Sequence, residues 1–155
     1  MSPGRGRGGA PARHERRAFE VTLSWGECDP AGIVYYATYL GWAERLHSEW
    51  WLAQGLHLSE MHDRLGARFS VRRVEVDYLA PALPLERVRC AMAVAAVGRT
   101  SFTQRFTFTR PAEGDVFAVM DLVAVFATAE RVPTPIPDLA RSLLEGGPAS
   151  DPVGS

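Results

Sequence analysis

The sequence predicts an α+β domain in which one long helix packs against a single antiparallel sheet. Two observations support this prediction. Apolar residues recur at helical spacing in one long segment, whereas in several other segments they alternate with polar residues or run almost unbroken, as in strands. The composition agrees, because 46% of the 155 residues are apolar and 23% are charged, which is typical of one folded domain.

The first strand is predicted at residues 19–25, where apolar and polar residues alternate. After the turn sequence at 29–32 the period changes, and this predicts a helix of roughly 18 residues ending before Gly55. A shorter helical turn is expected at 59–65. The apolar residues of the long helix recur at intervals of three and four: Tyr36, Tyr39, Leu40, Ala43, Leu46, His47, Trp50 and Trp51.

Four more strands are predicted after these helices, at residues 74–78, 88–94, 102–109 and 117–126. The last is apolar almost throughout, as expected of a strand that is covered on both faces. With only one long helix to cover the sheet, its other face or its edge needs a partner. We therefore expect a homodimer or a dimer of dimers, a homotetramer.

The folded domain is expected to span residues 18–144, between disordered tails at 1–17 and 145–155. The first tail is rich in Gly, Pro and Arg and carries a charge of +4, which leaves −5 on the rest of the chain. An RNA contact by this tail is one interpretation and a plain disordered leader is another. Because the body is acidic, no nucleic-acid partner is expected for it.

The cysteine count and the apolar runs bear on the compartment. Only 2 cysteines are present, the start of the chain has no apolar core typical of a secretory signal, and the longest apolar stretch is interrupted by Asp121. That stretch is shorter than the roughly 20 residues of a membrane helix. We therefore expect a cytoplasmic protein that does not associate with membranes.

The candidate catalytic residue lies in the segment 25–51, WGECDPAGIVYYATYLGWAERLHSEWW. Asp29 precedes a helix N-terminus, where unpaired backbone N–H groups and the helix dipole favour a developing negative charge. The order Asp-Pro-Ala-Gly is also typical of an ordinary type I turn. From spacing alone, a catalytic and a purely structural role for Asp29 both remain open.

This segment resembles the D-x-x-G-x-V-x-[YHN]-x-x-Y signature of the 4-hydroxybenzoyl-CoA thioesterase family, with matches at Asp29, Gly32, Val34, Tyr36 and Tyr39. Two further blocks, RRVEVDYLAPALPLERV and GRTSFTQRF, resemble later strands of the family. The likeness runs from about residue 19 to 137. It implies a hotdog fold, in which a five-stranded antiparallel sheet wraps a long helix, subunits join their sheets, and active sites lie at the dimer interface.

The resemblance also implies roles for individual residues. Asp29 corresponds to the catalytic carboxylate, and the backbone N–H of Tyr36 to the group that polarises the thioester carbonyl. Arg99 stands at a strand end that approaches the CoA phosphates, although the family shows a richer basic cluster there, so a carrier protein is an alternative to CoA. The other motif positions are expected to bind substrate: Gly32, Val34 and Tyr39.

Glu44 and His47 lie near one another on the predicted helix. Glu44 stands at the edge of the apolar face, where it either meets a polar acyl group or is a solvated or His47-paired glutamate. A core role is favoured for His47. The four histidines form no ligand spacing with cysteine, so no metal site or cofactor is expected.

The chemistry of a thioester explains why one carboxylate is sufficient. A thiolate with a pKa of about 8.5 leaves without a strong acid, so the reaction needs an activated carbonyl and an attacking oxygen. Asp29 either attacks, forming a mixed anhydride, or assists a water molecule.

These features predict a thioesterase acting on an acyl-CoA or acyl-carrier-protein thioester, with an aromatic (4-hydroxybenzoyl-like) or polyketide-like acyl group. The alternatives are a 1,4-dihydroxynaphthoyl-CoA or short-chain acyl-CoA thioesterase and a non-catalytic protein that binds acyl thioesters. A hotdog dehydratase is disfavoured, because the active-site histidine of such enzymes is not evident.

Overall fold

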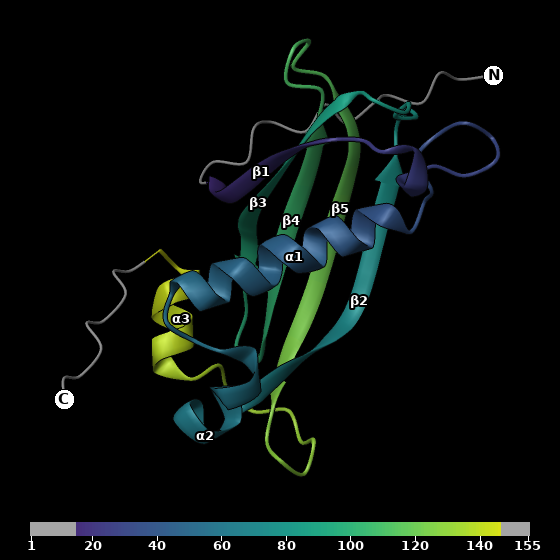
Figure 1. Ribbon diagram of the computed structural model, residues 1–155. Helices are drawn as coiled ribbons and strands as arrows, with labels where there is room; N and C mark the ends of the chain where they lie inside the picture. The colour runs from purple at the N-terminus through teal and green to yellow at the C-terminus, as the bar shows by residue number, and fades with distance from the viewer. Residues whose placement is uncertain (1–14, 147–155) are drawn as a thin grey trace, which may run out of the picture.

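The computed structural model describes residues 15–146. In chain order its elements are β1 (Glu15–Thr22), α1 (Thr38–Ala53), α2 (Met61–Leu65), β2 (Arg68–Tyr78), β3 (Arg87–Val97), β4 (Ser101–Thr109), β5 (Val116–Ala127) and α3 (Asp138–Leu144). Short 3₁₀ turns occupy Trp25–Glu27 and Leu58–Glu60. Figure 1 shows α1 lying across one face of the curved sheet, so the predicted α+β hotdog architecture is confirmed.

The sheet has five strands in the order β1-β3-β4-β5-β2, and all neighbours are antiparallel. Strands β1 and β2 therefore form its edges. Strand β2 is paired with β5 along its whole length, from Arg68 opposite Ala127 to Tyr78 opposite Ala118. Its other edge has no neighbouring strand within residues 15–146, and open edges of this kind are where sheets extend.

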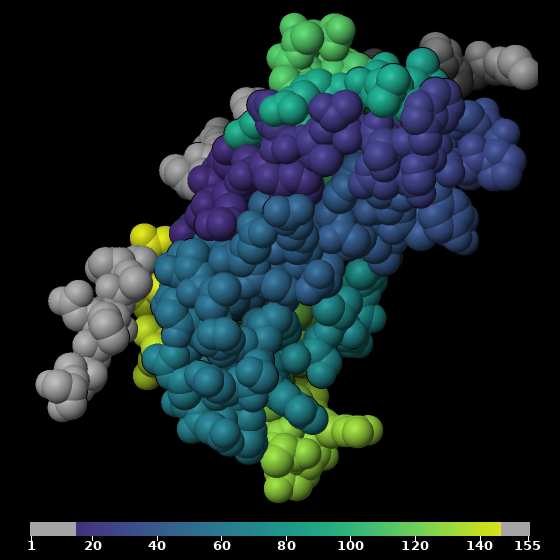
Figure 2. All heavy atoms as spheres, viewed as in Figure 1, coloured from purple at the N-terminus to yellow at the C-terminus, as the bar shows by residue number. Residues whose placement is uncertain are grey.

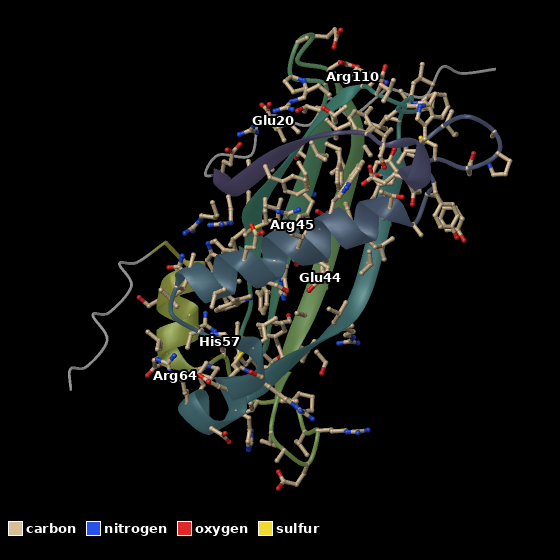
Figure 3. The ribbon with its side chains drawn as sticks, in the orientation of Figure 1. Glu20, Glu44, Arg45, His57, Arg64 and Arg110 are labelled. Carbon is tan, nitrogen blue, oxygen red and sulfur yellow. The ribbon has the colours of Figure 1, made fainter. Side chains whose placement is uncertain are left out.

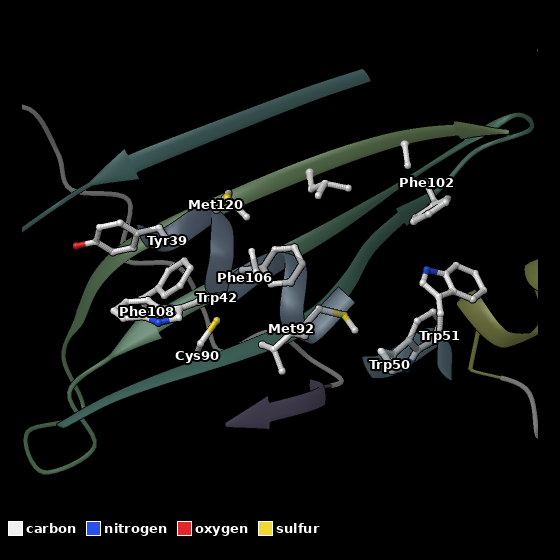
Figure 4. Packing of buried hydrophobic residues seen from close by; sticks show 14 of the residues in the cluster. Tyr39, Trp42, Trp50, Trp51, Cys90, Met92, Phe102, Phe106, Phe108 and Met120 are labelled. Atoms are coloured by element: carbon white, nitrogen blue, oxygen red, sulfur yellow. The ribbon is translucent and has the colours of Figure 1, made fainter. Parts of the chain in front are cut away.

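The core lies between α1 and the inner face of the sheet. Figure 4 shows Trp42 of α1 beside Phe108 of β4, with Met92 and Met120 further along the same layer. Phe106 is also fully buried, and complete burial of such a side chain stabilises the fold by about 1.5–3 kcal/mol. None of the helices in the described part of the chain is long and apolar enough to cross a membrane.

Two boundaries near the N-terminus differ from the prediction. Strand β1 begins at Glu15, inside the segment expected to be a tail, because the backbone pairs with β3 from there, Glu15 opposite Ala93. It ends at Thr22, and Trp25 is 69% exposed rather than part of the strand. The rest of the predicted tails, residues 1–14 and 147–155, lies outside the described residues.

Strand β5 was expected to be covered on both faces, and this expectation is wrong for the described chain. Buried and half-buried residues alternate along it, and α1 covers one face only. On the other face the carboxylate of Asp121 accepts two hydrogen bonds from Arg105 of β4. The apolar residues of that face are mostly valines, which also suit a half-buried strand.

Helix α3, which begins after Pro137, is not predicted by the sequence pattern. Its buried residues, Ala140, Leu143 and Leu144, have the spacing of a helix face, but 7 residues are too few to give a clear period. The long helix α1 has 16 residues and begins at Thr38, two residues after the predicted face starts.

Candidate active site

The loop that carries Asp29 is closed at its base and has a defined backbone. Cys28 and Val34 form an isolated antiparallel bridge, and the N–H of Asp29 donates to the carbonyl of Ile33 at 2.9 Å. Gly32 has a φ of +77° and donates its N–H to the carbonyl of Asp29 at 2.9 Å. Because side chains disfavour a positive φ, glycine suits this turn. Gly32 therefore shapes the loop and is not among the residues that line the cavity next to Asp29.

The two oxygens of the Asp29 carboxylate differ: one holds the turn, and the other accepts no hydrogen bond from the described residues. Its Oδ1 accepts a hydrogen bond from the N–H of Ala31 at 2.8 Å, which is the Asx turn expected of this sequence. Within residues 15–146, Oδ2 has no hydrogen-bond partner, and Asp29 lines a cavity. The structural role that spacing predicted is thus present, and it leaves one carboxylate oxygen available for chemistry.

The cavity next to Asp29 is an open, mainly apolar recess of about 390 Å³. One wall is the Asp29 loop and the start of α1, and the other is the end of β2 with the residues that follow it. It is lined by Asp29, Ile33, Val34, Tyr36, Tyr39, Tyr78, Leu79, Ala80 and Pro81. Four of the five positions that match the family motif therefore meet at one recess.

The residues just before α1 contribute a free backbone donor. The N–H of Tyr35 donates to the carbonyl of Glu27 at 2.8 Å, and the N–H of Thr38 to the carbonyl of Tyr35 at 2.9 Å. The N–H of Tyr36, between them, has no acceptor in the described part of the chain. An unpaired N–H at a helix N-terminus is suited to an anionic oxygen.

Val34 and Tyr39 form part of the cavity wall and have structural roles there. The N–H of Val34 donates to the carbonyl of Ala82 at 2.9 Å, which ties the loop to the chain after β2. The buried Tyr39 ring lies 5.1 Å from the Phe108 ring, edge to face. Burial raises the pKa of Tyr39 to about 12, so its hydroxyl stays protonated at neutral pH.

Glu44 is not brought into this cavity. It is exposed, and it accepts a hydrogen bond from the Ser48 hydroxyl at 2.5 Å. Figure 3 shows Arg45 leaving α1 toward β1 and Glu44 leaving it on the other side. Glu44 stands eight residues after Tyr36, about 12 Å further along the helix axis. It does not pair with His47, which bonds a different residue.

Arg99 lies at the other end of the sheet from Asp29. The Asp29 loop joins the fold near the first residues of β3, through the bond between Val34 and Ala82. Arg99 comes two residues after Val97, the last residue of β3, and the 11 residues of that strand span about 33 Å. One chain therefore does not bring Arg99 to the cavity.

Gln104 is a buried polar residue that the sequence analysis missed. Its Oε1 lies 2.5 Å from Nδ1 of His47, and since an amide oxygen only accepts, Nδ1 carries the proton. The Phe69 ring packs edge to face on the imidazole at 5.1 Å. The signal was present in the sequence, because Gln104 occupies the inward position between Phe102 and Phe106. A polar residue in that register usually has a buried partner.

His47 is expected to make the protein less stable in acid. Burial lowers the pKa of His47, although the bond to Gln104 and the nearby Glu44 oppose this effect. A folded-state pKa below the unfolded value of about 6.5 means that the unfolded chain binds more protons. The free energy of unfolding should therefore fall as the pH drops below about 6.5.

Urea unfolding at pH 8 and pH 5 measures this contribution. The double variant His47→Leu with Gln104→Leu removes both polar partners and should show a smaller loss of stability at pH 5 than the wild type. His57→Gln, at an exposed histidine, is the control and should retain the wild-type loss. Equal losses in the wild type and the double variant would contradict the assignment.

An exposed apolar surface adjoins the cavity where α1 passes β2. Tyr36 is 62% exposed and Leu40 is 42% exposed, although both belong to the predicted apolar face of the helix. Three apolar or aromatic residues of β2 are also exposed: Val71, Val74 and Tyr78. Figure 2 shows the blue surface of α1 with the teal surface of β2 below it.

A family model described as the thioesterase-like superfamily matches residues 23–144. No curated protein matches the chain. A solved structure of the thioesterase superfamily from Jannaschia sp. CCS1 is similar to it, with a TM-score of 0.75 and 24% identity, over 89% of this chain and 96% of that one.

Two solved thioesterases with named substrates are also similar. The 1,4-dihydroxy-2-naphthoyl-CoA thioesterase from Synechocystis has a TM-score of 0.74 and 17% identity, over 83% of this chain and 95% of that one. The 4-hydroxybenzoyl CoA thioesterase from Pseudomonas sp. strain CBS-3 has a TM-score of 0.69 and 24% identity, over 82% of this chain and 97% of that one. At these identities the likeness establishes a shared fold.

The family model covers the loop of Asp29, all of α1 and four strands of the sheet. The same region holds the three sequence blocks from which the family was predicted. The match therefore confirms the predicted family, and thioester hydrolysis is the reaction class that goes with it. This chain belongs to the thioesterase-like superfamily.

Proposed function

We propose that this protein hydrolyses an acyl-CoA thioester in the cavity at the start of α1. One observation carries the proposal: a carboxylate with an open oxygen and an unpaired helix N-terminal N–H, from Asp29 and Tyr36, belong to the same recess. Acyl transfer from sulfur requires these two groups, an attacking or proton-accepting oxygen and a donor for the carbonyl oxygen.

In the proposed reaction the N–H of Tyr36 donates to the thioester carbonyl oxygen. Asp29 Oδ2 attacks the carbonyl carbon and expels the thiolate, leaving a mixed anhydride that water then hydrolyses. Alternatively, Asp29 accepts a proton from the water that attacks. Both routes yield a carboxylic acid and a free thiol, and a backbone donor of this kind typically contributes about 3–4 kcal/mol to the barrier reduction.

The lining of the cavity favours an aromatic acyl group. Tyr36, Tyr39 and Tyr78 contribute three rings, and edge-to-face or offset contacts between rings contribute about 0.5–1.5 kcal/mol each. Two of the similar structures are named for aromatic acyl-CoA substrates, 4-hydroxybenzoyl-CoA and 1,4-dihydroxy-2-naphthoyl-CoA. We therefore place a 4-hydroxybenzoyl-like acyl group first and a dihydroxynaphthoyl group second.

Release of free thiol from a panel of CoA thioesters tests the proposal. The panel contains 4-hydroxybenzoyl-CoA, 1,4-dihydroxy-2-naphthoyl-CoA and acetyl-CoA, each with wild-type protein and with Asp29→Asn. The expected order of kcat/KM has the aromatic substrates above acetyl-CoA. Thiol release no faster with the wild type than with Asp29→Asn, for every substrate, would overturn the proposed function.

We further propose that two copies join along the free edge of β2. A two-fold axis there makes the two β2 strands antiparallel, so the end of one strand, at Tyr78, lies beside the start of the other. The β3–β4 hairpin lies near the start of β2. Phe126 of β5 is paired with Phe69 of β2, and it donates its N–H to the carbonyl of Thr100 in the hairpin at 2.8 Å. The dimer therefore brings the partner's hairpin toward the Asp29 cavity.

In this proposed dimer Arg99 of one subunit lies near the cavity of the other, although it is far from the cavity of its own chain. If the partner subunit's Arg99 binds CoA phosphates, Arg99→Ala should raise KM for the CoA thioester by about tenfold and leave kcat nearly unchanged. KM for the N-acetylcysteamine thioester of the same acyl group, which has no phosphates, should hardly change. Steady-state kinetics with both substrates measure the difference.

Arg87→Ala is the matched control, because it removes an exposed arginine that pairs with Glu20 at the opposite edge of the sheet.

If a carrier protein delivers the substrate instead, KM for the carrier-bound thioester should rise steeply with salt. Equal KM values for the CoA and N-acetylcysteamine thioesters in the wild type would show that Arg99 has no part in recognition.

A further inference from the structure

We propose that Tyr78 is a positioning residue for the oxyanion donor: its hydroxyl holds the backbone of Tyr36 in the conformation that aims the free N–H. This inference rests on the proposed function. Tyr78, the last residue of β2, donates its hydroxyl hydrogen to the carbonyl of Tyr36 at 2.8 Å. The two residues are 42 positions apart in the chain, and both line the cavity.

The carbonyl of Tyr36 needs this partner because α1 does not use it. The N–H of Leu40 donates to the carbonyl of Ala37 at 3.2 Å, one residue after Tyr36. The N–H of Thr38 donates to the carbonyl of Tyr35, one residue before it. Tyr36 O is thus skipped by the first hydrogen bonds of the helix, and within residues 15–146 the Tyr78 hydroxyl is its side-chain donor.

Two hydrogen bonds therefore fix the two peptide groups on either side of the Tyr36 Cα. Thr38 holds the carbonyl of Tyr35, and Tyr78 holds the carbonyl of Tyr36. Peptide groups are planar and trans, so each N–H points opposite to its carbonyl. The Tyr35 carbonyl shares its peptide group with the Tyr36 N–H, so the Thr38 bond sets the direction of that N–H. The Tyr78 bond holds the next peptide group and so limits the rotation about the Tyr36 Cα that would turn the N–H away. A shift of about 1 Å in such a group can reduce the rate up to 10²-fold.

Tyr78 is itself held in place by its ring. The ring lies 5.2 Å from the ring of the buried Tyr39, with an angle of 78° between them. Partial burial raises the pKa of Tyr78, so its hydroxyl remains a donor through the neutral range. Tyr78 therefore connects the edge strand β2 with the helix N-terminus, across the mouth of the cavity.

The variant Tyr78→Phe tests this role, because phenylalanine keeps the ring on Tyr39 and removes only the hydroxyl. Water that replaces the hydroxyl at Tyr36 O is not tied to β2, so the peptide gains freedom. With 4-hydroxybenzoyl-CoA we expect kcat to fall about tenfold while KM stays within about twofold. Ser59→Ala removes an exposed hydroxyl that does not line the cavity and should leave both unchanged.

An NMR measurement tests the bond without relying on activity. The amide nitrogen of Ala37 shares a peptide group with Tyr36 O, so its chemical shift should change more in Tyr78→Phe than in Ser59→Ala. Thermal unfolding should show the same Tm for Tyr78→Phe and the wild type, which separates positioning from stability.

The outcomes distinguish this inference from the proposed function. A wild type that hydrolyses no thioester of the panel overturns both. An active wild type with unchanged kcat in Tyr78→Phe overturns the role of Tyr78 alone. A raised KM with normal kcat also overturns it, since it would make Tyr78 a binding residue. An unchanged Ala37 nitrogen shift would show that the hydrogen bond is absent in solution.

Discussion

Replacing Asp29 by asparagine is expected to reduce kcat by at least about 10³-fold while leaving the fold intact. The amide oxygen of Asn can still accept from the N–H of Ala31, so the Asx turn observed at 2.8 Å is retained. An amide neither attacks a thioester nor accepts a proton from water at neutral pH. The substitution therefore separates the structural oxygen of the carboxylate from the reactive one.

Thiol release and thermal unfolding, measured on the same preparation, check this result. Asp29→Ala is the companion variant, because it removes both oxygens and should lower Tm as well as activity. Asp63→Asn, at an exposed aspartate of α2, should behave like the wild type. If Asp29→Asn keeps kcat within about tenfold of the wild type, the purely structural interpretation of Asp29 is correct.

Val71→Asp is expected to separate the proposed dimer and to reduce activity with it. Val71 is 51% exposed in the single chain, so the monomer tolerates a carboxylate there. In the dimer the same position is covered, and the two-fold axis buries two like charges. Burying an unpaired carboxylate costs several kcal/mol, so the dimer dissociation constant should rise by at least about 10³-fold.

Light scattering across a range of protein concentrations measures the assembly, and thiol release at the same concentrations measures activity. Leu52→Asp is the matched control: Leu52 is also 51% exposed but lies on α1, not on the edge strand β2. A strictly monomeric wild type with full activity would contradict both the β2 dimer and the shared site. A Val71→Asp dimer as tight as the wild type would place the interface elsewhere.

The sequence by itself determined the order of elements and the place of the loop that carries Asp29. Period-two segments became strands β2 to β4, the nearly unbroken apolar run became β5, and the segment with intervals of three and four became α1. These patterns are reliable because burial of one face acts on every residue of a strand or helix. The Asp29 turn was predictable for a different reason, since its hydrogen bonds to Ala31 and Ile33 are local.

Only the tertiary structure decided which contacts these faces make. Periodicity marks Tyr36 and Leu40 as part of an apolar face, but their exposure depends on where the helix crosses the sheet edge. Likewise, the bond from Tyr78 to Tyr36 spans 42 residues, and no local preference records it. The separation of Arg99 from Asp29 follows from strand length and antiparallel order. Contacts between distant segments arise from the packing of whole elements, which a one-dimensional pattern does not contain.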